Sequence, residues 1–161
     1  MEVTPTSTDT WLFSMDDKIA RPFLKGVAPS FSPDGKWVAY ASNQSGQSEI
    51  YVQPVSGASG TWQISTTGGV EPLWARTGTE LFYRDADKVQ AVDVQTEPSF
   101  VHGNPRTLFE GSYNLDGFFS RQYDVTSDSR RFLMVTRTPA TRPLNIVLNW
   151  SEELKRLVPV P

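Results

Sequence analysis

The side chains that could perform chemistry are few in this sequence of 161 residues. His102 is the only histidine, within the loop Phe-Val-His-Gly-Asn at 100–104, and cysteine is absent. A serine hydrolase needs a histidine beside an exposed serine, and no Gly-x-Ser-x-Gly turn presents one. A single histidine without cysteine also disfavours a zinc site. We expect His102 to be a surface-loop residue, and we predict no catalytic triad.

Acidic side chains are the other candidates. Asp16-Asp17 and Asp85-Ala86-Asp87 offer oxygen atoms, but neither has the spaced acidic loop that supplies six or more ligands to calcium. Asp34 and Asp128 lie in predicted turns, which their own side chains can stabilise. A glycoside hydrolase needs two carboxylates that face each other across a cleft, and 18 acidic residues nominate no particular pair. The sequence therefore predicts no catalytic residue, no cofactor and no metal ligand.

Aromatic and basic residues favour packing and solvation over ligand binding. The net charge is −3 and the pI is about 5.1, so non-specific binding of nucleic acid through a basic face is disfavoured. The basic pairs Arg130-Arg131 and Lys155-Arg156 are short, and we expect them to be solvated. Six aromatic residues recur at strand spacing and are expected in the core and between packed units: Trp37, Tyr40, Trp62, Trp74, Phe82 and Tyr83.

The elements that position these side chains are organised around Ser-Phe-Ser-Pro-Asp-Gly-Lys at 30–36. Proline, aspartate and glycine in this order form a β-turn, and the apolar residues on both sides predict a hairpin. Pro72, Trp74 and Gly78 follow Pro29, Phe31 and Gly35 at a constant offset of 43 residues. A weaker third copy surrounds Asp128 and Ser129, at an offset of 94. The hairpin is therefore a repeating unit.

Each unit has room for four strands. In the first unit we expect them at about 28–32, 36–42, 48–55 and 61–66; in the second, Val89–Val94 and Thr107–Phe109 are the third and fourth candidates. Four-stranded repeats of about 40–45 residues indicate a β-propeller, which is an all-β fold of four-stranded antiparallel blades. The expected organisation is a flexible lead-in at 1–10, a two-stranded partial blade at 11–27, blades at 28–67 and 68–117, and a blade at 118–161. The last would contain a strand at 144–148 and a short helical turn after Asn149.

These motifs resemble the TolB-like, or WD40-like, β-propeller repeat. The resemblance lies in Phe-Ser-Pro-Asp-Gly-Lys at 31–36, Trp-Val-Ala-Tyr-Ala-Ser after it, and Glu-Ile-Tyr-Val at 49–52. Later stretches, above all Asn-Trp-Ser-Glu-Glu-Leu-Lys-Arg-Leu-Val-Pro at 149–159, resemble the C-terminal end of six-bladed propellers linked to bacterial serine/threonine kinases and related sensor proteins. The sequence has no Gly-rich loop, His-Arg-Asp or Asp-Phe-Gly motif of a kinase. The resemblance thus implies a fold and no phosphotransfer.

About three blades fit in the chain, whereas closed propellers have four to eight. We therefore expect a partial six-bladed propeller whose open edges favour self-association. The predicted function is a non-catalytic module that binds a protein or small ligand at a ring face or in a central channel. Its variable loops would be 43–48, 56–60, 84–88 and 111–120. The alternative is a C-terminal propeller segment of a larger enzyme, either a kinase or a prolyl-oligopeptidase-type hydrolase, without activity of its own.

No targeting signal or membrane-spanning segment is recognisable in the sequence. No run reaches the roughly 18 apolar residues of a transmembrane helix, and the first ten residues have neither a basic nor an apolar signal region. We expect no membrane insertion. The resemblance to kinase-linked propellers, which often lie outside the cytoplasmic membrane, leaves the compartment open.

Overall fold

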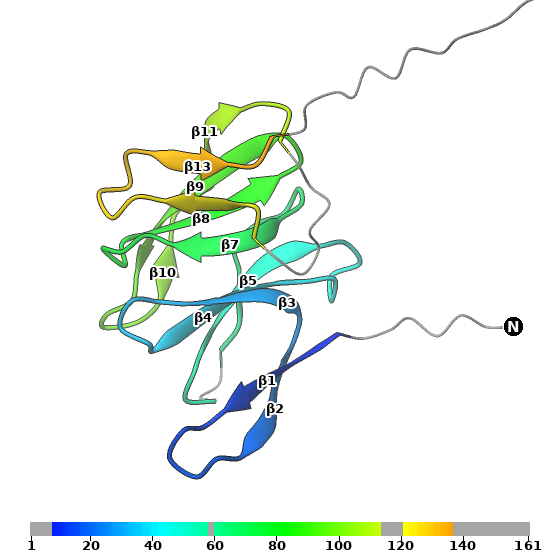
Figure 1. The fold of residues 1–161 in the computed structure, drawn as a ribbon, viewed down its shortest axis with the longest axis vertical. Coiled ribbons are helices and arrows are strands. Elements are labelled where there is room, and N and C mark those ends of the chain that lie inside the picture. Colours follow the sequence, from blue (N-terminus) through cyan, green and yellow to red (C-terminus); the bar gives the residue numbers. More distant parts are fainter. Residues whose placement is uncertain (1–7, 58–59, 114–120, 137–161) are drawn as a thin grey trace, which may run out of the picture.

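The computed structural model describes residues 8–57, 60–113 and 121–136, and this part of the chain is all-β (Figure 1). No helix in it is long and apolar enough to cross a bilayer. The strands are β1 (Asp9–Phe13), β2 (Ala20–Lys25), β3 (Val27–Phe31), β4 (Trp37–Ser42), β5 (Glu49–Pro54), β6 (Trp62–Gln63), β7 (Val70–Trp74), β8 (Glu80–Asp85), β9 (Lys88–Gln95), β10 (Val101–His102), β11 (Arg106–Glu110), β12 (Tyr123–Val125) and β13 (Phe132–Met134).

Two complete blades form the centre of the molecule. The first blade is an antiparallel meander in the order β3-β4-β5-β6, and the second has the order β7-β8-β9, with both β10 and β11 paired to β9. A two-stranded sheet stands on either side: the N-terminal hairpin β1–β2 and the C-terminal hairpin β12–β13. The predicted partial propeller is therefore confirmed.

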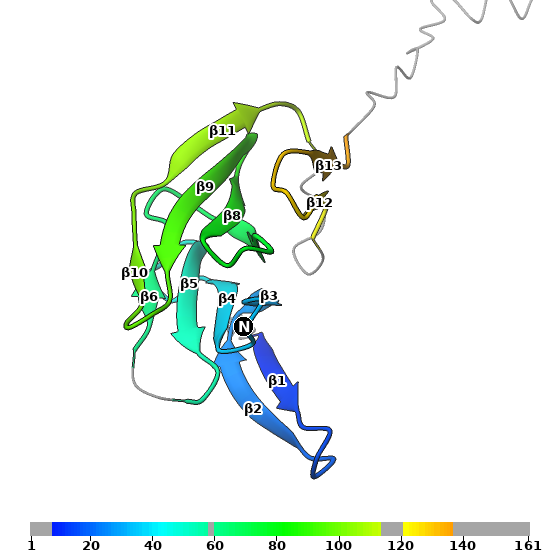
Figure 2. The same cartoon turned by 90° about the vertical axis from the view of Figure 1, so that its left-hand side faces the viewer.

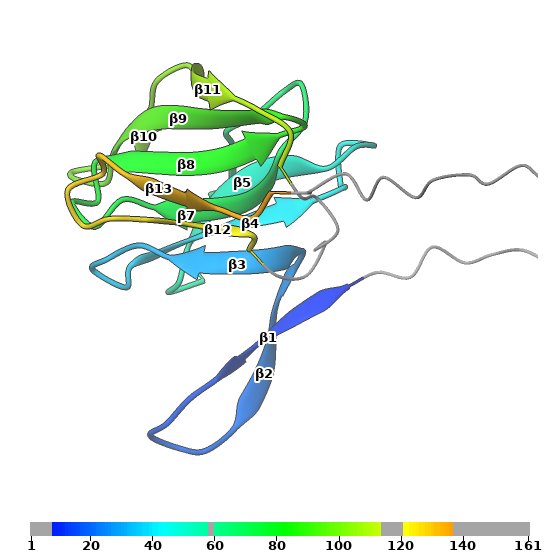
Figure 3. The same cartoon turned by 45° about the horizontal axis from the view of Figure 1, so that its top comes forward.

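The first strand of each blade is its inner strand. Figure 2 shows the sheets in an arc, with β3 and β12 on one side and the outer strands β6, β10 and β11 on the other. β7 packs against β3 and β4 of the preceding blade. The N-terminal hairpin projects away from the two complete blades (Figure 3).

The repeat offset is visible in the backbone. Gly35 and Gly78 occupy the same turn position with φ of 69° and 74°, and Ser129 has φ of 57° at the third copy. Ala28 and Glu71, again 43 residues apart, have φ of 51° and 56°. Each lies where the register of the inner strand shifts against its neighbour. The sequence offset therefore corresponds to a repeated backbone conformation, a bulged inner strand followed by a tight turn.

The largest of three apolar clusters lies between the two complete blades. Every second side chain of a strand points toward the neighbouring sheet, so alternating apolar residues meet across the interface. Four of the six aromatic residues expected in packing positions are buried, whereas Trp37 and Trp62 are half-buried at the edge of this core. The central cluster consists of Ala39, Ala41, Ile50, Val52, Ile64, Trp74, Leu81, Tyr83, Val92, Val94 and Phe100.

The structure corrects several expectations. The lead-in ends earlier than residue 10, because Asp9 and Thr10 pair with Lys25 and Leu24, and the Thr10 hydroxyl donates to the Gly26 carbonyl at 2.8 Å. The fourth strand of the first blade is only Trp62–Gln63, although the Ile64 amide after it still donates to the Ile50 carbonyl at 2.8 Å. The strand expected at 144–148 and the helical turn after Asn149 lie outside the described residues.

Candidate functional site

The blades have two ends with different loops. The turn end has the β-turns between the inner two strands of each sheet, at 32–36, 75–79 and 126–131. The opposite end, here the connector end, has the turns after β4 and β8 and the links from one blade to the next. The Val55 amide donates to the Lys36 carbonyl at 2.8 Å, so the loop that begins there belongs to the turn end.

The loops predicted to form one binding surface are therefore divided between the two ends. Loop 43–48 lies at the connector end, since the Gly69 amide donates to Ser48 at 2.9 Å. Loop 84–88 lies there as well, since the Gly111 amide donates to Asp87 at 2.9 Å. The described part of loop 56–60 is at the turn end. No single face uses all of these segments.

The connector end is held by a buried carboxylate. Glu49 is 1% exposed and accepts hydrogen bonds from the Ser65 hydroxyl, the Gln47 amide and the Gly68 backbone amide, the last at 3.1 Å. Ser65 in turn accepts from the Ile50 amide at 2.8 Å. Because the Ser65 and Gly68 contacts tie the link between the blades to β5, Glu49 is a structural anchor.

The aspartates of the turn end stabilise their own turns, as the sequence predicts. Asp34 accepts from the Ser32 hydroxyl at 2.5 Å and from the Lys36 amide at 3.1 Å. Asp128 accepts from the Arg130 amide at 3.1 Å and from the Thr126 hydroxyl. These hydroxyl donors are the main reason that the pKa of each aspartate is lowered.

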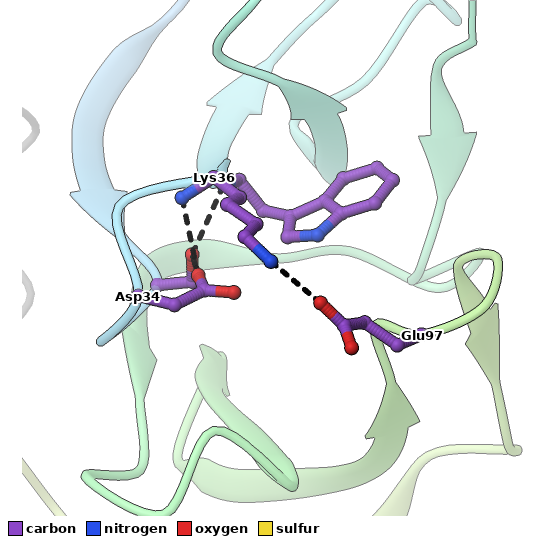
Figure 4. Close-up of polar contacts among 5 residues, drawn as sticks. Asp34, Lys36 and Glu97 are labelled. Carbon is purple, nitrogen blue, oxygen red and sulfur yellow. Dashed lines mark hydrogen bonds and ion pairs between the residues drawn. The ribbon is translucent and has the colours of Figure 1, made fainter.

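An ion pair at the turn end joins the two complete blades. Lys36 Nζ lies 2.5 Å from Glu97 Oε1, across 61 residues of sequence (Figure 4). The hydrogen bond from Lys36 to Glu97 is the main cause of the raised pKa of Lys36. One side of the pair borders a cleft of about 330 Å³, whose lining includes Asp34, Thr77 and Gln95. The other side borders a groove of about 600 Å³ between Trp37, Pro54 and Pro98.

His102 is not in a loop. It forms the two-residue strand β10 against Val94, is half-buried, and its ring centroid lies 6.2 Å from that of Phe100. Phe100 also contacts Trp37 at 5.0 Å and Trp62 at 5.1 Å. The aromatic packing of Phe100, just before β10, favours pairing of this short strand, which Gly103 and Asn104 after it concealed in the sequence.

A third depression, here the inner recess, lies on the inner wall of the arc. Its volume is about 420 Å³. Three sheets contribute to it through their inner strands and the residues beside them: Ser30, Phe31 and Pro33; Leu73, Trp74 and Arg76; and Arg121, Asp124 and Val125. Phe31 is 53% exposed, and Arg76, Arg121 and Asp124 are exposed. Trp74 forms part of the floor of the recess, and its Nε1 donates to the Ser30 carbonyl at 3.1 Å.

A buried ion pair positions the third sheet beside the second. Arg84 is fully buried, Glu71 is 3% exposed, and Arg84 Nη1 lies 3.8 Å from Glu71 Oε2. The same carboxylate accepts from the Gln122 amide at 3.1 Å, and the Tyr123 hydroxyl donates to the Glu71 carbonyl at 2.9 Å. Burial raises the pKa of Glu71, while the Gln122 amide and Arg84 oppose that rise.

This cluster determines where Arg121 lies. The contacts of Gln122 and Tyr123 fix the start of β12, and Arg121 Nε donates to the Tyr123 carbonyl at 3.1 Å. Sequence reasoning missed the cluster, because Arg84 was assigned to a variable loop. It lies in β8, at the repeat position of Ala41, which is also fully buried. The offset of 43 residues was therefore the signal that could have identified it.

The comparisons with known proteins support the fold. Neither a family model nor a curated protein sequence matches the chain. A solved structure assigned as TolB from Agrobacterium tumefaciens has a TM-score of 0.51 and 24% identity, over 63% of this chain and 41% of that one. TolB from Acinetobacter baumannii has a TM-score of 0.54 and 20% identity, over 81% and 32%. An oligogalacturonate lyase from Vibrio parahaemolyticus has a TM-score of 0.48 and 13% identity, over 77% and 34%.

The two TolB structures resemble the chain as β-propellers, in agreement with the sequence motifs. At such identities the similarity establishes the fold alone. The chain spans about a third to two fifths of the length of the TolB structures that it matches.

Proposed function

We propose that this chain is a non-catalytic binding module whose inner recess holds an acidic segment of a protein partner. The observation that carries the proposal is the way in which the repeats converge on this recess. Ser30, Leu73 and Asp124 are the same repeat position, at offsets of 43 and 94 residues. Phe31, Trp74 and Val125 form a second such set.

Some blade positions stay alike between the first two repeats, since Val38 and Leu81 are both apolar and fully buried, and Gly35 and Gly78 both have positive φ. One recess position changes in charge and size instead, as Ser30, Leu73 and Asp124. Asp124 is exposed, so burial does not determine its side chain, and its polar group is accessible to a ligand.

The chemistry of the recess suits a carboxylate-bearing peptide. Arg76 and Arg121 supply planar guanidinium groups with several donors, which bind carboxylates well. Asp124 offsets one of these charges, so the three ionised groups of the recess sum to +1. Phe31 adds an exposed apolar surface for a neighbouring side chain of the ligand.

The absence of catalysis is part of the proposal. The single histidine is engaged in β10, and Asp34, Asp128 and Glu49 have structural hydrogen bonds. Among the described residues, no cluster of three or more His, Cys, Asp or Glu side chains could hold a metal ion. These facts favour binding over chemistry at the recess.

Selection of a peptide ligand tests the proposal. A phage library of random short peptides is selected on the immobilised chain, and binding of the enriched peptides is measured by fluorescence anisotropy. We expect acidic sequences whose affinity falls with added salt. Arg76→Ala or Arg121→Ala should weaken binding about tenfold or more, since hydrogen bonds to charged groups contribute about 1.5–3 kcal/mol.

Arg106→Ala is the matched control. Arg106 is exposed on the outer strand β11, outside the recess, and its loss changes the net charge equally. The proposal is wrong if enriched peptides lack acidic residues, or if R106A weakens binding as much as R121A does. Turnover of a peptide or oligosaccharide by the purified chain would contradict the non-catalytic part.

A further inference from the structure

The described chain has an incomplete blade at each end of its arc. β1–β2 and β12–β13 are separate two-stranded sheets, whereas the blades between them have four strands or more. Figure 2 shows these two hairpins at opposite ends of the arc, β1–β2 at the bottom and β12–β13 at the upper right. Among the described residues each strand of these hairpins is paired along one edge only, so β1 and β13 each have a free edge. The isolated bridge from Tyr113 to Thr136 lies just after β13.

The two hairpins are different halves of a blade. β1–β2 directly precedes the inner strand β3, as β5–β6 precedes the inner strand β7, so it corresponds to the outer two strands. β12–β13 contains the turn that also joins β3 to β4, so it corresponds to the inner two strands. One end therefore lacks the half-blade that the other end presents.

Burial agrees with this assignment. Leu133 of β13 is 74% exposed, yet the same repeat position is fully buried at Ala39 and 1% exposed at Phe82 in the complete blades. On β1, Trp11 and Phe13 are 58% and 53% exposed, while β5 of the complete first blade is almost entirely buried. The exposed apolar side chains lie on the strands that lack a neighbour.

Charges of opposite sign lie at one point of the two edges, in a turn where Asp17 already pairs with Arg21 at 2.5 Å. In the first blade the Val55 amide, just after β5, donates to the carbonyl of Lys36, just before β4. Arg130 occupies the repeat position of Lys36, 94 residues later, and Arg131 follows it. If β13 pairs with a β1 strand as β4 pairs with β5, these arginines meet the turn at Met15 and Asp16. Arg130, Arg131 and Asp16 are all exposed.

We propose that a second copy of this chain completes both half-blades. The C-terminal hairpin of each copy pairs through β13 with β1 of the other copy, antiparallel, as β8 pairs with β9. The contact is head to tail, and two such contacts close the assembly by twofold symmetry. The described residues of each copy supply two whole blades and two halves, so the pair makes a six-bladed ring, within the range of closed propellers. The ring would also close the channel onto which the inner recess opens.

The first test is the mass of the whole chain in solution, measured by light scattering after size exclusion over a concentration series. We expect a discrete dimer of twice 18.0 kDa. Leu133→Asp should convert it to a monomer of unchanged circular dichroism, because Leu133 is exposed within one copy. A native monomer at every concentration overturns the proposal and favours residues 137–161 of the same chain as the neighbour of β13. Aggregates without a discrete dimer overturn it as well.

The second test determines the arrangement. Since the chain contains no cysteine, Met15→Cys or Asp16→Cys can be mixed with Arg130→Cys under mild oxidation. The mixture should form a disulfide-linked heterodimer, whereas each variant alone should not. Asp16→Cys mixed with Arg106→Cys, on the outer strand β11, is the control pair and should stay unlinked. A dimer that cross-links only through identical cysteines overturns the head-to-tail arrangement. These measurements use no ligand, so their failure is distinct from failure of the recess proposal.

Discussion

The buried Glu71–Arg84 pair gives the sharpest prediction about stability. Arg84→Met keeps an apolar stem of similar length but removes the guanidinium group. The Glu71 side chain, which is only 3% exposed, then lacks this partner for its carboxylate. At 3.8 Å and an effective dielectric constant near 20, the attraction lost is about 4 kcal/mol. Removing one partner of a buried pair generally costs about 3–5 kcal/mol, so we expect a loss in that range.

Urea unfolding followed by tryptophan fluorescence measures this loss. Arg106→Met is the matched control, because Arg106 is half-exposed and its 2.5 Å contact with Glu80 lies at the surface. We expect no more than about 1 kcal/mol from the control. The double variant E71Q/R84M should be more stable than R84M alone, because it removes the buried charge as well as its partner.

Two results would refute this reasoning. One is a loss below about 1 kcal/mol for R84M, which would mean that water or another group replaces the guanidinium at no cost. The other is simple additivity in the E71Q/R84M cycle, which would show that the two side chains do not interact.

Three further predictions concern the turns, the pH dependence and the surface pair. Ser129→Gly should raise the free energy of unfolding by about 0.5–1 kcal/mol, because Ser129 has φ of 57° and glycine adopts that region without strain. Gly78→Ala should lower the free energy of unfolding by about 1 kcal/mol, because Gly78 has φ of 74°. Urea unfolding midpoints measure both changes. Burial raises the pKa of Glu71 above its ordinary 4.5, so the folded state holds that proton more tightly than the unfolded one. The stability of the native chain relative to E71Q should therefore fall as the pH rises from about 4.5 through the folded pKa; urea titrations that show a constant difference would contradict this. Glu97→Gln should lower the raised pKa of Lys36 toward its ordinary value in an NMR titration of Nζ, with an unchanged unfolding midpoint, since the pair is exposed.

The fold could be predicted because its determinants are local and repeated. The Pro-Asp-Gly turn and the 43-residue offset specify a hairpin that recurs, and the positive φ of Gly35 and Gly78 is what such a turn requires. Asp34 and Asp128 were assigned to their turns for the same reason, because a side chain that bonds its own backbone needs no distant partner.

The surfaces were less predictable, because they depend on which segments meet after folding. Lys36 and Glu97 are 61 residues apart, and nothing near either residue indicates the other. Glu71 and Arg84 meet because the inner strand bulges at Glu71, a feature seen only in the backbone. Loops 43–48 and 56–60 were grouped as variable segments, although successive loops of a meander must lie at opposite ends of a blade.

A photo-crosslinking measurement tests the central claim most directly. A photoreactive phenylalanine analogue replaces Phe31 in the inner recess in one variant, and Val101 on β10 in another. The native side chains at these positions are 53% and 56% exposed, so the two probes have similar accessibility and differ mainly in where they lie. With a selected, labelled acidic peptide, we predict capture at position 31 that an excess of unlabelled peptide abolishes, and none at position 101. Equal capture at both positions, or capture at 101 alone, would contradict a binding site on the inner wall of the propeller.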